Sequence, residues 1–132
     1  MEPLITFLNP YDIKETEHHL PEKLPALKEK ILSEGIWRVP ITVEKRSLVV
    51  MDGHHRLQTA KALGLSVIPC VLLEYKDVLV ESRRSDFLVT PEEIIRRGLA
   101  GDLYPAKSTR HIFSSEYSCH VPLSELVISQ AA

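Results

Sequence analysis

The residues Asp52 to Arg56 have the types and spacing needed to bind a phosphate or another anion. They follow an apolar, strand-like run, Leu48 to Met51, and lead into a helical pattern, Leu57 to Leu63. The first N–H groups of a helix have no partner within it, and the aligned peptide dipoles add partial positive charge there. A bound anion satisfies both. The sequence therefore predicts an anion site at this helix start.

Each side chain of this segment fits that prediction. Gly53 lets the backbone approach a ligand, Arg56 offers a planar fork for phosphate oxygens, and the imidazoles of His54 and His55 can donate further hydrogen bonds. The simpler interpretation is a helix cap at Asp52 followed by a turn glycine, but a cap does not require two histidines and an arginine. Zinc is not favoured, because no His-x-x-x-His pair occurs.

A second polar and basic cluster, Lys107 to His111, lies far along the chain. Its members Ser108, Thr109, Arg110 and His111 add hydroxyl, cationic and imidazole groups. A multiply charged phosphate chain requires such donors from more than one segment, so the two clusters together indicate a nucleotide. For this cluster alone, a charged surface loop remains the alternative. Neither Gly-x-x-x-x-Gly-Lys nor Gly-x-Gly-x-x-Gly occurs, which disfavours a P-loop enzyme and a Rossmann dehydrogenase.

Phosphoryl transfer would also need a carboxylate that orients or deprotonates the acceptor hydroxyl, and usually Mg²⁺ to offset phosphate charge. Asp52 lies beside the predicted phosphate site, and Glu15 and Glu17 lie in the polar segment before the first predicted helix. The residues alone do not separate Glu15 from Glu17, and a solvated glutamate is the simpler interpretation of each. We expect no dedicated metal site, with Mg²⁺ held through the phosphates.

Hydrophobic spacing and turn residues predict the elements that position these groups. The first predicted helix has Leu24, Leu27, Ile31 and Leu32 on one face. The predicted elements are a strand at Ile5–Leu8, a loop at Tyr11–His19, a helix at Pro21–Glu34 ending at Gly35, strands at Val39–Val43 and Leu48–Met51 joined by a turn at Glu44–Ser47, a helix from Gly53 ending at Gly64, a strand at Val67–Leu73, and a helix that follows Thr90 and ends at Gly98 or Gly101.

Composition limits the class of protein. A chain of 132 residues with 44% hydrophobic content suits one domain, covering residues 1–132. The net charge is -2 without a cationic tail, so broad binding to nucleic acid is not expected. Cys70 lies in an apolar run, where a buried thiol is the default, and a reducing cytoplasm fits best. No apolar run is long enough to span a bilayer, so we expect no membrane association.

Three stretches resemble a known family: Leu24 to Pro40, Val49 to Arg56 with its sequence Val-Val-Met-Asp-Gly-His-His-Arg, and Gly101 to His111 with its ending Lys-Ser-Thr-Arg-His. They are similar to the ParB/sulfiredoxin-like superfamily, and within it to the free serine kinase group. The resemblance implies a compact α/β domain with a small mixed sheet and flanking helices. It also implies a kinase that phosphorylates L-serine to O-phospho-L-serine with ADP or ATP.

The resemblance also implies roles for particular residues. The catalytic glutamate that activates the serine hydroxyl falls on Glu17, and the aspartate near the transferred phosphoryl group falls on Asp52. Residues 53–56 correspond to the phosphate motif, and Ser108 to His111 correspond to contacts with the amino acid and phosphate. The chain departs from the archaeal members in the short connection Lys76 to Lys107, which leaves the nucleotide, the pocket lid and the acceptor hydroxyl open.

The same superfamily supplies alternatives to the kinase. Sulfiredoxin carries a cysteine where this chain has His54, so the sulfur chemistry is not expected. Partition proteins add a helix-turn-helix domain that we do not expect in a chain of this length. A nucleotide-binding regulator without catalysis, with a DNA or protein partner, remains the alternative function.

Overall fold

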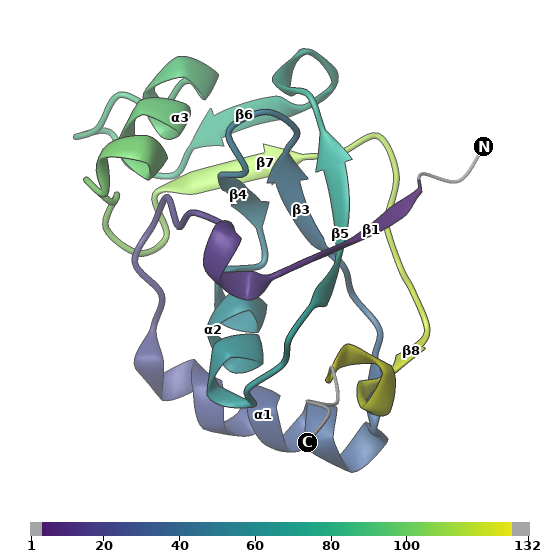
Figure 1. Ribbon diagram of the computed structural model, residues 1–132. Helices are drawn as coiled ribbons and strands as arrows, with labels where there is room; N and C mark the ends of the chain where they lie inside the picture. The colour runs from purple at the N-terminus through teal and green to yellow at the C-terminus, as the bar shows by residue number, and fades with distance from the viewer. Residues whose placement is uncertain (1–3, 128–132) are drawn as a thin grey trace.

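The computed structural model describes residues 4–127 and is built around a four-stranded mixed sheet (Figure 1). The strand order is β1-β5-β3-β4. β5 (Ile68–Leu73) runs parallel to β3 (Ile41–Glu44) and antiparallel to β1 (Ile5–Leu8), and β4 (Val50–Asp52) runs antiparallel to β3. The β3–β4 hairpin therefore leads directly into the predicted phosphate segment. The predicted α/β fold with a small mixed sheet is confirmed.

Two short antiparallel ribbons lie outside this sheet. β6 (Leu79–Ser82) pairs with β7 (Thr109–Ile112), and β2 (Ile36–Trp37) pairs with β8 (Val121–Pro122). The sequence pattern predicts neither ribbon, because each joins short strands that lie far apart in the chain. For the second polar cluster the surface-loop alternative is wrong, since its residues from Thr109 onward belong to β7.

α1 (Leu24–Glu34) and α2 (His54–Ala62) pack against each other at one end of the molecule, as Figure 1 shows. Pro21–Lys23, which the spacing assigns to the first helix, forms a 3-10 turn before it. The helix ends as predicted at Gly35, whose φ of +69° lets its N–H donate to Ile31 O at 2.9 Å.

α3 (Pro91–Ala100) lies at the opposite end, near β6 in Figure 1. Thr90 caps it by accepting the Glu93 N–H at 3.2 Å, as predicted from the capping pattern. Gly101 ends the helix, so the alternative end at Gly98 is wrong. Gly98 is buried inside α3, where a Cβ would come within 2.6 Å of Val49 Cγ1. Glycine here permits the close approach of α3 to the start of β4.

The core lies between the sheet and helices α1 and α2. Its side chains are apolar and almost fully buried; they include Trp37, Ile41, Val43, Val50, Leu57, Ile68 and Cys70. Burial of Cys70 agrees with the prediction. Leu32 does not, because 53% of it is exposed. Ile31 is the one buried residue of the predicted apolar face of α1, so this helix presents a narrower stripe than its sequence suggests.

Within residues 4–127, none of the helices combines the length and apolar character that crossing a bilayer requires.

Candidate active site

The N-terminus of α2 forms one wall of the site. Gly53 occupies the N-cap position with φ +118°, in the left-handed region. A Cβ there would lie 3.0 Å from Ile41 Cγ1, so glycine is needed both for the backbone angle and for the close approach to β3. The first bond that closes the helix runs from Leu57 N to Gly53 O at 2.8 Å. The N–H groups before Leu57 have no helical partner and can bind an anion.

Asp52 does not cap this helix, so that simpler interpretation of the segment is wrong. It is the last residue of β4, where its N–H donates to Thr42 Oγ1 at 2.9 Å. The N-cap residue is Gly53, and no side chain caps α2. Among residues 4–127, no hydrogen bond or ion pair engages the exposed Asp52 carboxylate. It is therefore free to face a ligand.

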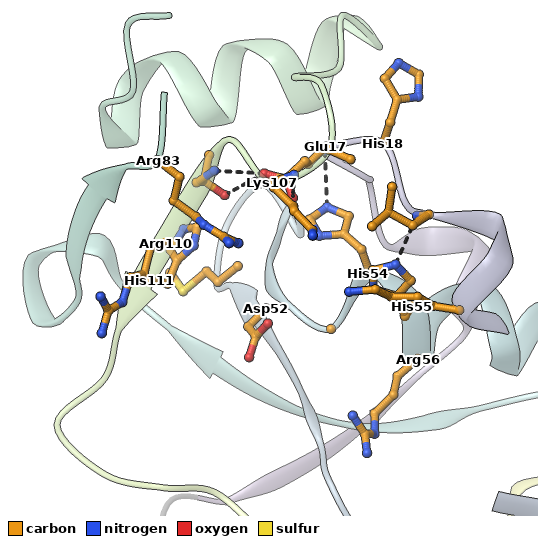
Figure 2. A pocket seen from close by; sticks show the side chains of 16 residues that line it. Glu17, His18, Asp52, His54, His55, Arg56, Arg83, Lys107, Arg110 and His111 are labelled. Atoms are coloured by element: carbon orange, nitrogen blue, oxygen red, sulfur yellow. Dashed lines mark hydrogen bonds between the residues drawn. The ribbon is translucent and has the colours of Figure 1, made fainter. Parts of the chain in front are cut away.

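A cleft of about 500 Å³ opens at the start of α2. It is lined by Glu17, by residues 52–56, and by Thr109, Arg110 and His111. Figure 2 shows Arg110 and His111 along one side, His55 and Arg56 along the other, and Asp52 between them. Two clusters that lie about fifty residues apart in the sequence thus face the same space.

Ser108 is the one predicted site residue whose side chain does not line the cleft. It is fully buried, and its Oγ donates to Pro105 O at 2.6 Å. Its backbone N–H instead donates to Glu17 Oε1 at 3.0 Å. The sequence indicates the right segment but not the burial of this hydroxyl, because burial depends on how the turn before β7 folds.

The Glu17 carboxylate is held by the second cluster. Oε1 accepts hydrogen bonds from Ser108 N at 3.0 Å, Thr109 N at 2.9 Å and Thr109 Oγ1 at 3.1 Å. Oε2 accepts from Lys107 N at 3.2 Å. Lys107 has φ +61°, and this left-handed conformation helps successive N–H groups to converge on one anion. Glu15 does not line the cleft, so the structure distinguishes two glutamates that the sequence pattern cannot.

The segment that carries Glu17 is fixed by His54. Thr16 N and Glu17 N both donate to His54 Nε2, at 3.1 and 3.2 Å, and the Thr16 hydroxyl lies 3.1 Å from the same atom. Because backbone N–H groups can only donate, Nε2 must be unprotonated. Burial, with smaller contributions from His111, His55 and His19, lowers the pKa of His54 to about 3. His54 is therefore a neutral acceptor at Nε2, and Nδ1–H is the donor that its ring keeps.

His55 has a similar contact on the other side of α2. Its Nε2 accepts the Leu20 N–H at 3.0 Å, so this atom too cannot donate to a phosphate. Burial and the neighbouring Lys23 lower the pKa of His55. The remaining donor of the neutral ring is Nδ1–H. Together, the adjacent histidines attach the segment from Thr16 to Leu20 to the start of α2.

His111 lies on β7 and is also kept neutral. Its Nε2 is 2.9 Å from Tyr75 Oη, and its ring stacks on Phe113 with an interplanar angle of 14°. Burial lowers the pKa of His111 to about 4. The imidazole is thus a fixed, uncharged wall of the cleft.

The cleft has an excess of positive charge. Arg56, predicted from the motif, is joined there by Lys23, Arg83, Lys107 and Arg110. Arg56 makes no hydrogen bond or salt bridge with any other residue of the described chain. The prediction of site residues missed Lys23 and Arg83, and it included Lys107 only as part of the cluster. Their positions depend on the 3-10 turn before α1 and on the β6–β7 ribbon, for which the sequence carries no clear signal.

No protein-family model matches this chain. Among curated proteins, a ParB-like protein from Sulfolobus acidocaldarius is 37% identical over 67 residues, 51% of this chain and 34% of that protein. An ATP-dependent L-serine kinase from Staphylothermus marinus is 38% identical over 65 residues, 46% of this chain and 26% of that kinase. Another ATP-dependent L-serine kinase, from Desulfurococcus mucosus, is 36% identical over 93 residues, which are 63% of this chain and 36% of that kinase. The chain spans about a third of the length of the curated relatives it matches.

Among solved structures, a free serine kinase in complex with AMP superimposes with a TM-score of 0.86 at 16% identity, over 96% of this chain and 95% of that chain. SbnI with C-terminal truncation from Staphylococcus aureus superimposes with a TM-score of 0.82 at 15% identity, over 92% of this chain and 88% of that chain. The predicted fold is therefore confirmed as the one that these proteins share. The resemblance to the free serine kinase group is confirmed as well, in sequence by the two serine kinases.

Proposed function

We propose that this protein is a nucleotide-dependent kinase that transfers a phosphoryl group from ATP or ADP to the hydroxyl of a free amino acid, L-serine. One observation carries the proposal: the Glu17 carboxylate lies in the same cleft as the open N-terminus of α2 and an excess of cations. A base, an anion site and positive charge around them are what phosphoryl transfer requires. The relatives named serine kinases support serine as acceptor.

In this proposal, Gly53, Arg56 and the N–H groups that begin α2 bind the phosphates of the donor. Arg56 offers a bidentate fork, and the helix terminus offers oriented N–H groups and a positive dipole end. Thr109, Arg110 and His111 line the opposite side and contact the amino acid and the transferred phosphate. Ser108 acts through its backbone, since its N–H holds Glu17.

Glu17 acts as the base that accepts the proton of the serine hydroxyl. Three hydrogen bonds converge on Oε1 and one reaches Oε2, so Oε2 keeps more capacity to accept another proton donor. We assign proton transfer to Oε2. The backbone donors hold the carboxylate in one orientation, which favours a fixed geometry with the hydroxyl.

Asp52 lies between the two sides of the cleft, close to where the transferred phosphoryl group would be. Its exposed carboxylate suits a magnesium ion that is bound chiefly through the phosphates of the nucleotide, since Mg²⁺ commonly takes one or two carboxylates beside phosphate oxygens. Such a metal would offset the negative charge of the phosphates.

The donor is ATP or ADP. Relatives named ATP-dependent support ATP, and a mutant of the free serine kinase solved with ADP, at a TM-score of 0.85, supports binding of the diphosphate. We place the reaction in the cytoplasm, where these nucleotides are available. The free thiols of Cys70 and Cys119 fit a reducing compartment.

Purified protein with magnesium should convert serine to O-phospho-L-serine with ATP or ADP, as detected by mass spectrometry. Glu17→Gln should lower kcat by about 100-fold or more while nucleotide affinity changes little, because a positioned base contributes about 10² to 10⁴. Glu15→Gln is the matched control, since Glu15 lies two residues away and outside the cleft. Full turnover in Glu17→Gln would contradict the proposed base.

The similarity to a ParB-like protein supports one alternative function, a nucleotide-binding regulator without catalysis. A regulator would bind nucleotide, form no phosphorylated product with any hydroxyl amino acid, and be insensitive to Glu17→Gln. Retention of labelled DNA or of a protein partner only in the presence of nucleotide would favour this alternative.

A further inference from the structure

Arg83 is fixed beside Glu17 by two backbone contacts. It follows directly after β6, whose last residue, Ser82, pairs with Thr109. The Arg83 N–H donates to Ser108 O at 2.9 Å, and the Ser108 N–H donates to Glu17 Oε1 at 3.0 Å. Arg83 and Glu17 are therefore attached to opposite sides of the same peptide segment, although they are distant in sequence.

The guanidinium of Arg83 faces the cleft and has no partner there. Arg83 lines the cleft, and Figure 2 shows its side chain extending toward the interior. No hydrogen bond or salt bridge joins this guanidinium to another residue within 4–127. The next residue, Arg84, differs sharply, because its guanidinium is paired with the Asp86 carboxylate at 2.8 and 3.0 Å.

We propose that Arg83 binds the carboxylate of the acceptor amino acid and so restricts the acceptors to hydroxy compounds that carry a carboxylate. The inference rests on the proposed kinase function. If Glu17 accepts the proton of the hydroxyl, the acceptor carboxylate, only a few bonds away, must also lie near Glu17. Two carboxylates this close repel each other unless a cation lies between or beside them.

Arg83 is better suited to this role than the other cations of the cleft. The guanidinium of Arg110 already has an ionic partner, the Glu81 carboxylate at 3.8 Å. Arg56 lies on the opposite side of the cleft, at the start of α2. Lys107 is near Glu17 but presents a single ammonium rather than a planar fork. An arginine can bind both oxygens of a carboxylate with two parallel hydrogen bonds.

The test compares Arg83→Ala with Arg84→Ala in the full chain, with serine and with serinamide, which keeps the hydroxyl but lacks the carboxylate. Arg83→Ala should lower kcat/KM for serine about 10- to 100-fold, mainly through KM, as expected for one charge-assisted bidentate contact. For serinamide it should change little, so the preference for serine over serinamide should nearly disappear. KM for the nucleotide should stay within about twofold. Arg84→Ala should resemble the wild type.

Other outcomes would overturn the inference in distinguishable ways. An equal loss with serine and serinamide would mean that Arg83 supports the structure of the cleft or contacts the phosphoryl group, and a raised KM for the nucleotide would mean that it contacts the donor. Unchanged kinetics for serine would remove Arg83 from acceptor binding while leaving the kinase proposal intact. A wild-type protein that phosphorylates no hydroxyl amino acid would overturn the proposed function, and this inference with it.

Discussion

At the scale of single residues, the two histidines of the phosphate segment are acceptors toward the backbone. His54 Nε2 receives the N–H groups of Thr16 and Glu17, and His55 Nε2 receives that of Leu20. The side chains thus position the segment that carries Glu17. An imidazole in this role must stay neutral, because protonated Nε2 would become a donor facing other donors.

This requirement predicts a loss of stability in acid. An unfolded histidine takes up its proton near pH 6.5, whereas folded His54 does so only near pH 3. Between these values the unfolded state binds more protons, so stability falls as the pH falls. His54→Gln, whose amide oxygen can still accept a hydrogen bond, should weaken this dependence by about 1.4 kcal/mol per pH unit.

Urea denaturation from pH 7 to pH 4 would measure the difference in slope. His18, which is exposed on the same segment, provides the control as His18→Gln, and its slope should match the wild type. Parallel wild-type and His54→Gln curves would mean that His54 takes up its proton over the same pH range in the folded and the unfolded protein.

At this scale, sequence patterns do not say which of Glu15 and Glu17 belongs to the candidate site. Both are polar residues in a segment without hydrophobic periodicity, so spacing and composition cannot rank them. The structure separates them through the N–H groups of residues 107–109, which converge on Glu17 alone. This contact is non-local, and the preference for Glu17 in the sequence came from resemblance to a family.

At the scale of elements, the tight junction from β4 to α2 is the feature that local sequence describes best. Gly53 is required by its φ of +118° and by the Ile41 side chain, which lies 3.0 Å from the point that a Cβ would occupy. Strand, glycine turn and helix follow each other within the chain, so their order can be read directly from spacing. The same reasoning correctly predicts the end of α1 at Gly35, and for α3 it gives two candidate ends, of which the structure has Gly101 and not Gly98.

Gly53→Ala should both destabilise the protein by about 1 to 3 kcal/mol and weaken nucleotide binding, because the strained backbone must shift at the proposed phosphate site. Gly64→Ala is the matched control. Gly64 also has a positive φ, +68°, but its Cβ would enter open space outside the cleft. Gly64→Ala should lower stability without lowering nucleotide affinity, so calorimetric nucleotide titrations of the two variants should differ. Equal nucleotide affinity in both would contradict phosphate binding at Gly53.

The ribbons β2–β8 and β6–β7 are the elements that the sequence does not reveal. The two strands of each ribbon lie far apart in the chain, so no local turn joins them and no hairpin pattern marks them. Because β6–β7 positions Arg83 and the second cluster, missing this ribbon also means missing part of the cleft.

At the scale of the whole molecule, charge is distributed unevenly. The net charge is -2, yet the cleft is lined by five lysines and arginines against two carboxylates, Glu17 and Asp52. Fields of this kind attract anionic ligands and are screened by salt.

We therefore expect nucleotide affinity to fall several-fold, roughly 3- to 10-fold, between 50 and 200 mM NaCl. Arg56→Ala should weaken binding and reduce this salt dependence, because it removes an unpaired cation from the phosphate side of the cleft. Arg38→Ala is the control, since Arg38 is exposed and paired with Glu34 outside this cleft. Isothermal titration at several salt concentrations measures both effects. Unchanged affinity in Arg56→Ala would contradict the phosphate assignment.

The hydrogen bonds that hold Glu17 join residues 90 to 92 positions apart. Closing so long a loop loses more chain entropy than forming a local helix or hairpin does. We therefore expect these contacts to form late in folding. During synthesis, Glu17 leaves the ribosome long before its partners exist. The chain can therefore gain its sheet and first two helices, with His54 already holding the backbone N–H of Glu17, before the N–H groups that orient the Glu17 carboxylate exist. In the proposed kinase, catalytic competence is then among the last properties that the growing molecule acquires.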